Sequence, residues 1–429
     1  MYASCRRCAA TANDRMSCVH IVELCPHPWA PHRRDASGQN RAVNARRITI
    51  AVGLTMLVES SLYQAVVPLL PSYSDRFHLS KTGAGLVLAA YPLPTPVIGL
   101  LSGLVTPRIG GRRMALAGSA LLTFSTLAFA LAPNAVVLDL ARGLQGIAAG
   151  ITWAASMAWL SANTPRDRLP RESGIVMGLF SAGAVLGPGI GSFAHATSPL
   201  LAFTCLAGVA ALTIPLVLRA PAGRTIAPEH SYVRSIGSAL RHRLVLAAIL
   251  LSVIDPVSLG AIDLLVPRHL HAHGVATWHI GAALMIGAAL GAISGPLAGR
   301  RAQRIGPLRV GVGAAVALAI MPALLITGLS DPAQLLLLVA VAPAFTIMAT
   351  ALYPLSTRGA DERGVSHGVV NGVLSVTWAT AFAVGSLTTG LLADRHGDTA
   401  TYAIVAVVCA SLLATLAVIA RGSPQPAPV

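Results

Sequence analysis

The chain has 429 residues, of which 54% are hydrophobic and only 11% are charged. An average soluble domain carries about 25% charged residues, so a water-soluble protein of this length would lack the charged surface that keeps it dispersed. The formal net charge of +15 suggests nucleic acid, but no basic stretch alternates with aromatic residues that could stack on bases. The composition therefore predicts an integral membrane protein and excludes a nucleic-acid-binding one.

The first 47 residues carry arginines and four of the six cysteines, but no apolar run long enough for a signal peptide. We expect a disordered basic tail over residues 1–47, or translation that begins at Met16. Cys5 and Cys8, with the histidines that follow, could in principle bind zinc, yet their spacing matches no defensible zinc pattern. No disulfide framework, metal site or cofactor is predicted.

Twelve apolar segments follow, and each has about the 20 residues that a helix needs to cross a bilayer. Only helices or closed barrels satisfy their backbone hydrogen bonds in lipid, and these segment lengths indicate helices. The predicted fold is all-α and integral to the membrane. Its twelve helices are expected near residues 48–70, 83–105, 114–132, 136–160, 174–195, 199–219, 244–267, 278–299, 308–329, 333–355, 366–393 and 400–420.

Basic residues concentrate in the loops on one side of these helices, which in membrane proteins is the cytoplasmic side. The loops after the second, fourth, sixth, eighth and tenth helices each hold at least two arginines. The opposite loops hold only Arg76, Lys81, Arg268 and Arg395. Both termini are therefore expected in the cytoplasm, with the protein in the cell inner (plasma) membrane.

The longest connection, residues 220–243, divides six helices from six and contains Pro221, Gly223 and Pro228. We expect a first six-helix half over 48–219, a cytoplasmic linker over 220–243, a second half over 244–420 and a C-terminal tail over 421–429. Some transporters consist of two such halves, related by a pseudo-two-fold axis along the membrane normal.

An internal repeat supports this division. A shift of 196 residues, without any gap, places Pro71 on Pro267 and Arg108 on Arg304. The tripeptide Arg-Ile-Gly then stands at the same position after a helix in both halves, which is harder to attribute to chance than single matches.

The same shift places Glu59 on Asp255, each about twelve residues before a proline, Pro71 or Pro267, that is expected to end its helix. A carboxylate in the middle of a membrane helix is costly and normally faces a cavity or a partner. We predict that the two acids line one water-accessible cavity at similar depth, one on each half. Asp263, two turns beyond Asp255, is a further candidate on roughly the same face. The alternative for each acid is a hydrogen bond to a neighbouring helix.

Arg142 is the one basic residue predicted to lie well inside a helix, and Gln145 and Gly146 follow it one turn later. Helical rise places Arg142 and Glu59 about 5 to 6 Å apart in depth, which a long arginine side chain can cover. A carboxylate binds its proton more or less tightly according to whether a guanidinium pairs with it. Such a pair would couple proton binding to conformation.

Arg142, Gln145 and Gly146 are similar to the fourth-helix motif of the major facilitator superfamily, whose arginine is implicated in proton transfer. The loop between the second and third helices resembles the signature gating loop of that family. Its matching residues are Gly103, Arg108, Gly110, Arg112 and Arg113.

The fifth helix resembles the antiporter motif, which is associated with exporters rather than importers. Its matching residues are Gly174, Gly183, Gly187, Pro188 and Gly191. The glycines at every fourth position form a bare stripe that lets another helix approach closely, and ordinary tight packing is the alternative to a role in export. The stretch from Glu59 to Tyr73 also resembles vesicular amine transporters, in which the acid recognises a cationic substrate.

Two features depart from the family pattern. Pro107 and Gln303 stand where the signature loop normally has an acid, so its charge relay must be weakened or moved. The tenth helix lacks the acid of proton-driven amine carriers, and Asp394 is too near the outer end of the eleventh helix to replace it.

The sequence and the resemblance together predict a secondary active transporter, the twelve-helix drug:proton antiporter type, that exports small amphipathic or cationic compounds by alternating access. The expected partners are a small-molecule substrate, protons and membrane lipid, but not nucleic acid, and a monomer is expected. No nucleophile elbow or metal box indicates an enzyme. The alternatives are a transporter of one specific metabolite and a non-transporting membrane receptor or scaffold, which would not need acids in mid-membrane.

Overall fold

The computed structural model describes residues 36–165, 168–222, 237–365 and 367–421. Residues up to Val43 form a unit of their own, and Asn44–Val429 form a second, compact unit that contains all the features discussed below. Most of the expected N-terminal tail, with its cysteines, most of the linker and the C-terminal residues 422–429 lie outside the described residues.

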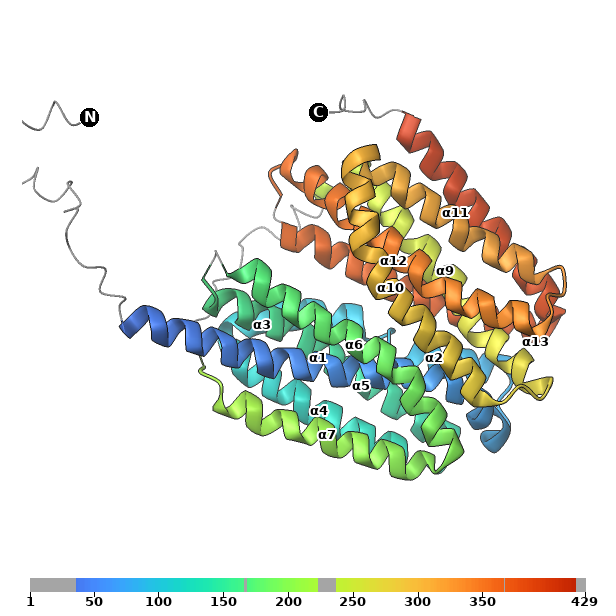
Figure 1. The fold of residues 1–429 in the computed structure, drawn as a ribbon, viewed down its shortest axis with the longest axis horizontal. Coiled ribbons are helices and arrows are strands. Elements are labelled where there is room, and N and C mark those ends of the chain that lie inside the picture. Colours follow the sequence, from blue (N-terminus) through green and yellow to red (C-terminus); the bar gives the residue numbers. More distant parts are fainter. Residues whose placement is uncertain (1–35, 166–167, 223–236, 366, 422–429) are drawn as a thin grey trace, which may run out of the picture. The chain divides into compact units, whose positions relative to one another are not determined.

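Every regular element in the described residues is an α-helix (Figure 1). The helices are α1 (Ala36–Phe77), α2 (Lys81–Ala90), α3 (Thr95–Ile109), α4 (Gly111–Ala130), α5 (Ala135–Asn163), α6 (Leu169–Ala196), α7 (Pro199–Arg219), α9 (Arg243–Ala272), α10 (Thr277–Ile305), α11 (Pro307–Leu325), α12 (Asp331–Asp361) and α13 (His367–Arg421).

The described helices make twelve membrane crossings, as the hydropathy pattern predicts. Eleven helical segments are long and apolar enough to span a bilayer. One of them, Val369–Ile419, contains Gly397 with φ 81° and ψ 170°, a non-helical conformation that divides α13 into two helices. The short helices α2 and α3 together form the second crossing, Lys81–Ile109. The all-α prediction is confirmed.

Three of the predicted helix boundaries are wrong. α1 begins at Ala36 rather than near residue 48, and the prolines expected to end helices do not end them. α1 continues past Pro71 to Phe77, and α9 continues past Pro267 to Ala272. A proline removes one backbone N–H, and membrane helices tolerate this because packed neighbours satisfy the freed carbonyl group.

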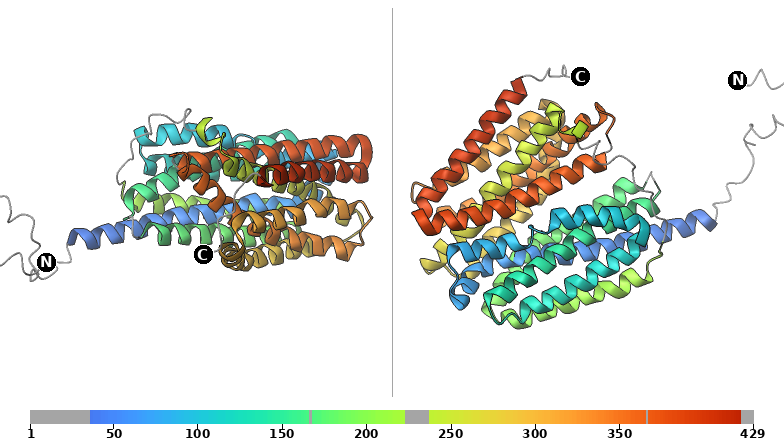
Figure 2. Two further views of the ribbon diagram at one scale, coloured as in Figure 1. Left: turned by 90° about the horizontal axis from the view of Figure 1, so that it is seen from above. Right: turned by 180° about the vertical axis from the view of Figure 1, so that it is seen from behind.

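Helix packing divides the bundle into a first half, α1–α7, and a second half, α9–α13 (Figures 1 and 2). In the first half α4 packs against α5 and α7, and in the second half α11 correspondingly packs against α12 and α13. Two helix pairs make most of the contacts between the halves: α2 with α13, and α6 with α10. Smaller contacts join α3 with α13 and α2 with α9. A pseudo-two-fold axis that exchanges the halves also exchanges the two main pairs, so the packing has the predicted symmetry.

The repeat extends to backbone geometry at the turn after the second and eighth crossings. Gly110 has φ 99° and ψ 137°, and its N–H donates to the Thr106 carbonyl. Gly306, which lies 196 positions later, has φ 92° and ψ 140°, and its N–H donates to the Ala302 carbonyl. A positive φ of this kind favours glycine, which explains why both copies of Arg-Ile-Gly end in this residue.

The two halves touch at one end of the bundle, which we call the distal side, where α1 and α9 end. There His271 of α9 lies 3.0 Å from the Asp75 carboxylate of α1, and Ser192 of α6 donates to the Thr277 carbonyl of α10. Asp394 of α13 accepts hydrogen bonds from the first two backbone N–H groups of α2, at 3.0 and 2.9 Å. Asp394 therefore caps a helix of the other half.

We call the other end of the bundle, where α3 and α10 end, the terminal side. There, glycines of α3, α6 and α10 face open space. A Cβ atom added to any of these glycines would find no neighbour within 4 Å. They are Gly99, Gly103, Gly174, Gly178 and Gly299. The helices of the two halves also diverge toward this side (Figure 2). The bundle is thus closed distally and open on the terminal side.

Candidate functional site

Glu59 lies in the middle of α1 and is almost enclosed, with 5% of its surface exposed. The Tyr91 hydroxyl donates to its Oε1 at 3.3 Å, and its Oε2 has no hydrogen-bond partner. Tyr91 occupies this position because α2 ends there, where Pro92, Pro94 and Pro96 interrupt the second crossing. The interruption of the second crossing thus places the Tyr91 side chain beside Glu59.

Arg142 of α5 is completely buried, with 0% of its surface exposed. Its Nη1 donates to the Gln145 side-chain oxygen at 3.0 Å, one helical turn away, while Nε and Nη2 make no hydrogen bond. Its guanidinium carbon lies 4.9 Å from the Tyr91 ring centroid and 5.9 Å from that of Tyr63. The two ring faces supply the electrostatic stabilisation that a buried cation needs.

The expected direct pairing of Glu59 with Arg142 is not formed in this structure. Tyr91 stands between them, because its hydroxyl contacts the acid and its ring contacts the guanidinium. The acidic side chain within electrostatic range of Arg142 is Asp139, one turn earlier on the same helix. The arginine is therefore coupled to Glu59 through a tyrosine rather than through an ion pair.

Asp255 lies in α9 and is fully enclosed, with 0% of its surface exposed. The indole Nε1–H of Trp378, on α13, donates to Oδ2 at 2.9 Å, and Oδ1 has no partner. Asp263, two turns further along α9, is buried as well and lies within electrostatic range of Asp255 and of Tyr63 in the other half. The acids of α9 therefore face the first half and not the lipid.

A row of four aromatic rings joins the two acid sites across the halves. The Tyr91 and Tyr63 centroids are 4.8 Å apart, those of Tyr63 and Phe382 are 6.3 Å apart, and those of Phe382 and Trp378 are 5.6 Å apart. Separations of 4.5 to 7 Å are typical of interacting rings. Glu59 bonds to one end of this row, and Asp255 bonds to the other.

Exposure differs between the acids and the aromatic row. Tyr63 and Trp378 are partly exposed, whereas Glu59 and Asp255 are enclosed behind them. The prediction that both acids line a water-accessible cavity is therefore not met in this conformation. They occupy opposite halves, as predicted, but the surface between the halves is aromatic.

The signature loop also has a definite geometry. Gly110 provides the turn between α3 and α4, and Arg112 donates to the Ala220 carbonyl at 3.1 Å, just after the end of α7. Arg108 is exposed, and Gly103 meets no neighbour. These contacts lie within the first half, and the gating role of the loop stays a prediction.

The glycine stripe of α6 packs against α1, which carries Glu59. A Cβ atom on Gly183, Gly187 or Gly191 would clash with the α1 backbone between Leu57 and Ala65. The carbonyl of Pro188, on the same helix, lies against Gly281 of α10, in the other half. Close approach along the stripe, as predicted, thus occurs, but Gly174 takes no part in it.

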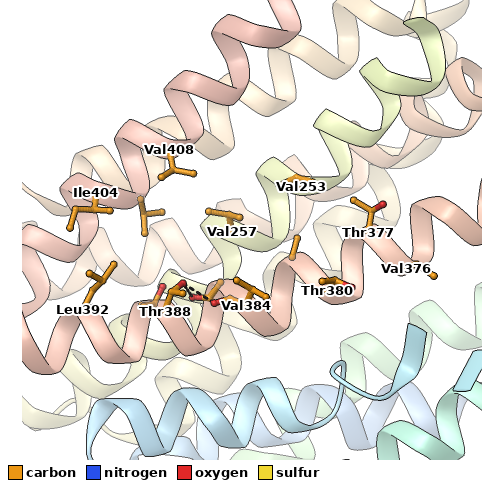
Figure 3. A pocket seen from close by; sticks show the side chains of 14 residues that line it. Val253, Val257, Val376, Thr377, Thr380, Val384, Thr388, Leu392, Ile404 and Val408 are labelled. Carbon is orange, nitrogen blue, oxygen red and sulfur yellow. Dashed lines mark hydrogen bonds between the residues drawn. The ribbon is translucent and has the colours of Figure 1, made fainter. Parts of the chain in front are cut away.

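A cavity of about 600 Å³ lies between α9 and the two helices of α13 (Figure 3). It is not the acid site, because Val253 and Val257 line it and Asp255 lies two residues from each, on the opposite face of α9 at 100° per residue. Its lining is apolar apart from Thr377, Thr380, Thr388 and Thr389.

Sequence reasoning missed the aromatic residues that contact the acids. One signal was present: the Tyr-Pro-Leu-Pro-Thr-Pro run interrupts an otherwise apolar span, and such interruptions in transporters mark binding sites. No comparable signal marks Trp378 or Phe382, because the repeat offers no proline run in the second half.

Chemically, the site can hold and release protons and can attract a cation. Each acid has one oxygen bonded to an aromatic donor and one oxygen free to take a proton or a ligand. Aromatic faces beside carboxylates form a favourable surface for organic cations.

Comparison with known proteins agrees with this geometry. The model of the Major Facilitator Superfamily matches residues 49–382. The chain is 27% identical over 180 residues to Multidrug resistance protein 1 of Bacillus subtilis, covering 41% of this chain and 46% of that protein. It is 28% identical over 138 residues to Quinolone resistance protein NorA of Staphylococcus aureus, covering 32% of this chain and 36% of that protein. The chain thus matches less than half the length of either relative.

Among solved structures, the fold is similar to a bacterial homolog of the human lysosomal transporter Spinster in an inward-facing and unoccupied conformation. The TM-score is 0.68 at 15% identity, over 90% of this chain and 99% of that one. The family assignment rests on the match over most of the length. The twelve crossings in two related halves agree with it. The chain is a multi-pass membrane protein that belongs to the Major Facilitator Superfamily.

Proposed function

We propose that this transporter exports small amphipathic or cationic compounds in exchange for protons. One observation carries the proposal: two enclosed carboxylates, Glu59 and Asp255, on opposite halves, each with one free oxygen, are joined by a continuous row of aromatic rings. The relatives are a multidrug resistance protein and a quinolone resistance protein, and their names support the same substrate class.

The aromatic row supports recognition of flat or cationic compounds. Tyr63 and Trp378 are partly exposed, so a bound compound can lie against their rings while its positive charge is attracted by the acids behind them. A neutral polar metabolite would gain less from this site, because it carries no positive charge for the ring faces and the acids to attract. This distinction favours the amphipathic or cationic class over a single polar metabolite.

Protons and substrate would compete for the same free oxygens. A cationic compound that approaches Glu59 is held best when the carboxyl group is ionised, and protonation of that group weakens the attraction. Proton entry from one side then releases the substrate to that side, and proton loss on the other side restores binding. This competition gives exchange without requiring a direct contact between Glu59 and Arg142.

Sidedness follows from the basic loops. The terminal side carries Arg108, Arg112 and Arg113 after α3, and the positive-inside rule assigns such loops to the cytoplasm. We place both termini there, so the conformation described above is open toward the cytoplasm and closed toward the outside. A compound would be loaded from the cytoplasm, and the distal contacts would have to open to release it.

The test uses everted membrane vesicles that contain the full-length chain and an imposed proton gradient, acidic inside. A fluorescent lipophilic cation such as ethidium should accumulate, and its addition should make the vesicle interior less acidic as protons leave. We expect Glu59→Gln to abolish both signals while expression is unchanged, because the amide keeps the shape but carries neither charge nor a titratable proton. Glu362→Gln, at an exposed position on the terminal side, should behave like wild type.

The outcomes separate the hypotheses. Accumulation of ethidium by Glu59→Gln at the wild-type rate would reject the assignment of that acid. Ethidium accumulation without proton movement would leave export in place and reject proton coupling. No movement of any lipophilic cation by the wild-type chain would favour a specific-metabolite transporter or a non-transporting receptor.

A further inference from the structure

Three metal-ligating side chains meet on the distal side, at the ends of α9 and α12, away from the acid site. His269 lies in the last turn of α9, His273 follows the helix directly, four residues later, and their ring centroids are 4.1 Å apart. Residues four apart share one helix face, so both imidazoles project to the same place. Two histidines at this spacing on a helix can bind one zinc ion together.

The third group comes from another helix. Asp331 is the first residue of α12, 58 positions after His273, and its Oδ1 lies 2.9 Å from Nδ1 of His273. One ligand atom from each of His269, His273 and Asp331 lies within 4.8 Å of the other two. The sequence offered no metal pattern here, because the carboxylate is remote in the chain and only folding brings it beside the histidines.

The donor set determines the class of ion. Two imidazoles and one carboxylate suit zinc and the neighbouring divalent metals cobalt and nickel, rather than magnesium or calcium, which prefer oxygen ligands. Three protein ligands leave a fourth position for water. His269 and Asp331 are partly buried and His273 is exposed, so an ion can enter from the medium without unfolding the helix ends.

The local backbone also favours a cation. The C-terminal end of a helix carries partial negative charge from its free carbonyl groups, and both histidines lie in the last turn of α9 or directly after it. A metal ion can take the place of the hydrogen bond between His273 and Asp331. While the Asp331 carboxylate is ionised, Nδ1 of His273 carries the proton of this hydrogen bond. When a metal ion replaces the bond, the neutral ring carries its proton on Nε2 instead, which frees the Nδ1 lone pair for the ion without net release of a proton.

We propose that His269, His273 and Asp331 form a binding site for a divalent transition metal of the zinc class, which joins the distal ends of α9 and α12. This site is independent of the transport proposal, since it shares no residue with the acid site. Because the ion binds only when the two helix ends are together, it also stabilises the folded second half.

The test uses the full-length chain purified in detergent through a tag without histidine, with its thiols alkylated so that the N-terminal cysteines cannot bind metal. Isothermal titration calorimetry with Zn²⁺ should show one binding event that weakens by at least about tenfold in His273→Gln and in Asp331→Asn. His279→Gln, an exposed histidine at the same side in α10, should bind Zn²⁺ like wild type. Equal affinity in all four proteins would overturn the proposal.

A second measurement needs no variant. Diethylpyrocarbonate modifies accessible histidines, and mass spectrometry locates the modified residues. Zn²⁺ should protect His269 and His273 but not His279 in the wild-type protein. Modification of His269 and His273 at the same rate with and without Zn²⁺ would show that the ion does not bind there.

Discussion

The bond between Trp378 and Asp255 should contribute measurably to both stability and transport. Trp378→Phe removes the indole N–H that donates to Oδ2 of Asp255 at 2.9 Å but keeps an aromatic ring beside Phe382. Asp255 is fully enclosed and its other oxygen already lacks a partner. The variant therefore leaves a buried acid with no hydrogen bond, which costs about 1.5 to 3 kcal/mol when the acid is charged.

The assay can follow a buried thiol. Cys409 is fully enclosed, so its thiol reacts with a maleimide dye only when the protein unfolds, once Cys205 and the N-terminal cysteines have been blocked in the folded state. Trp378→Phe should lower the unfolding midpoint, and Asp255→Ala, which removes the accepting oxygen, should make the additional Trp378→Phe change much less costly. The matched control is Trp278→Phe, at a position that is 60% exposed on the distal side, where no shift is expected.

A double-mutant cycle isolates the interaction from the individual changes. A coupling of about 1 kcal/mol or more between positions 255 and 378 is expected, given the length and burial of the bond. If the two changes simply add, the hydrogen bond does not contribute and the aromatic row is ordinary packing. Ethidium transport by Trp378→Phe at the wild-type rate would further show that this end of the row is not used by substrate.

The remaining predictions concern the arginine and three glycines. Arg142→Lys should strongly reduce ethidium uptake by vesicles although the charge is kept, because an ammonium group is not planar and cannot stack on two tyrosine rings while it bonds Gln145. Full activity would mean that a positive potential is sufficient. Gly187→Ala should destabilise the protein by about 1 to 3 kcal/mol, because the new Cβ would lie 2.6 Å from Gln64 Cβ. Gly174→Ala, whose new Cβ would face open space, should be neutral or stabilising, and equal thermal midpoints for the two variants would refute this contrast. Gly306→Ala should cost about 1 to 2 kcal/mol because its φ is 92°, again read from the thermal midpoint.

The sequence was sufficient for those features that depend on local pattern or on the repeat. Hydropathy located twelve crossings, and the shift of 196 residues paired Gly110 with Gly306, which adopt the same turn in the structure. The glycine spacing on α6 predicted a closely packed partner helix, and the structure identifies that partner as α1. These successes share a cause: each feature is specified by residues close together in one segment.

The contacts of the acids could not be predicted in the same way. Tyr91 and Trp378 contact Glu59 and Asp255 from other helices, distant in the chain. The sequence of an apolar span does not show which neighbouring helix an aromatic side chain faces. Depth alone suggested that Arg142 would pair with Glu59, because helical rise gives height along the membrane normal but not rotation about the helix axis. The prolines misled for a related reason, since tertiary packing decides whether a membrane helix continues past them.

The two helix pairs that hold the halves together pack in the same way, with a glycine of one helix against the backbone of the other. At the contact of α2 with α13, Gly85 lies against the Ser386 carbonyl and Gly390 lies against the Lys81 carbonyl. At the contact of α6 with α10, Pro188 lies against Gly281 with backbone touching backbone.

Both of these contacts between the halves are therefore places where helices touch through small residues with little side-chain packing between them. A rotation of one half against the other would pivot at two contacts of the same kind, and few side chains would have to be repacked at either of them.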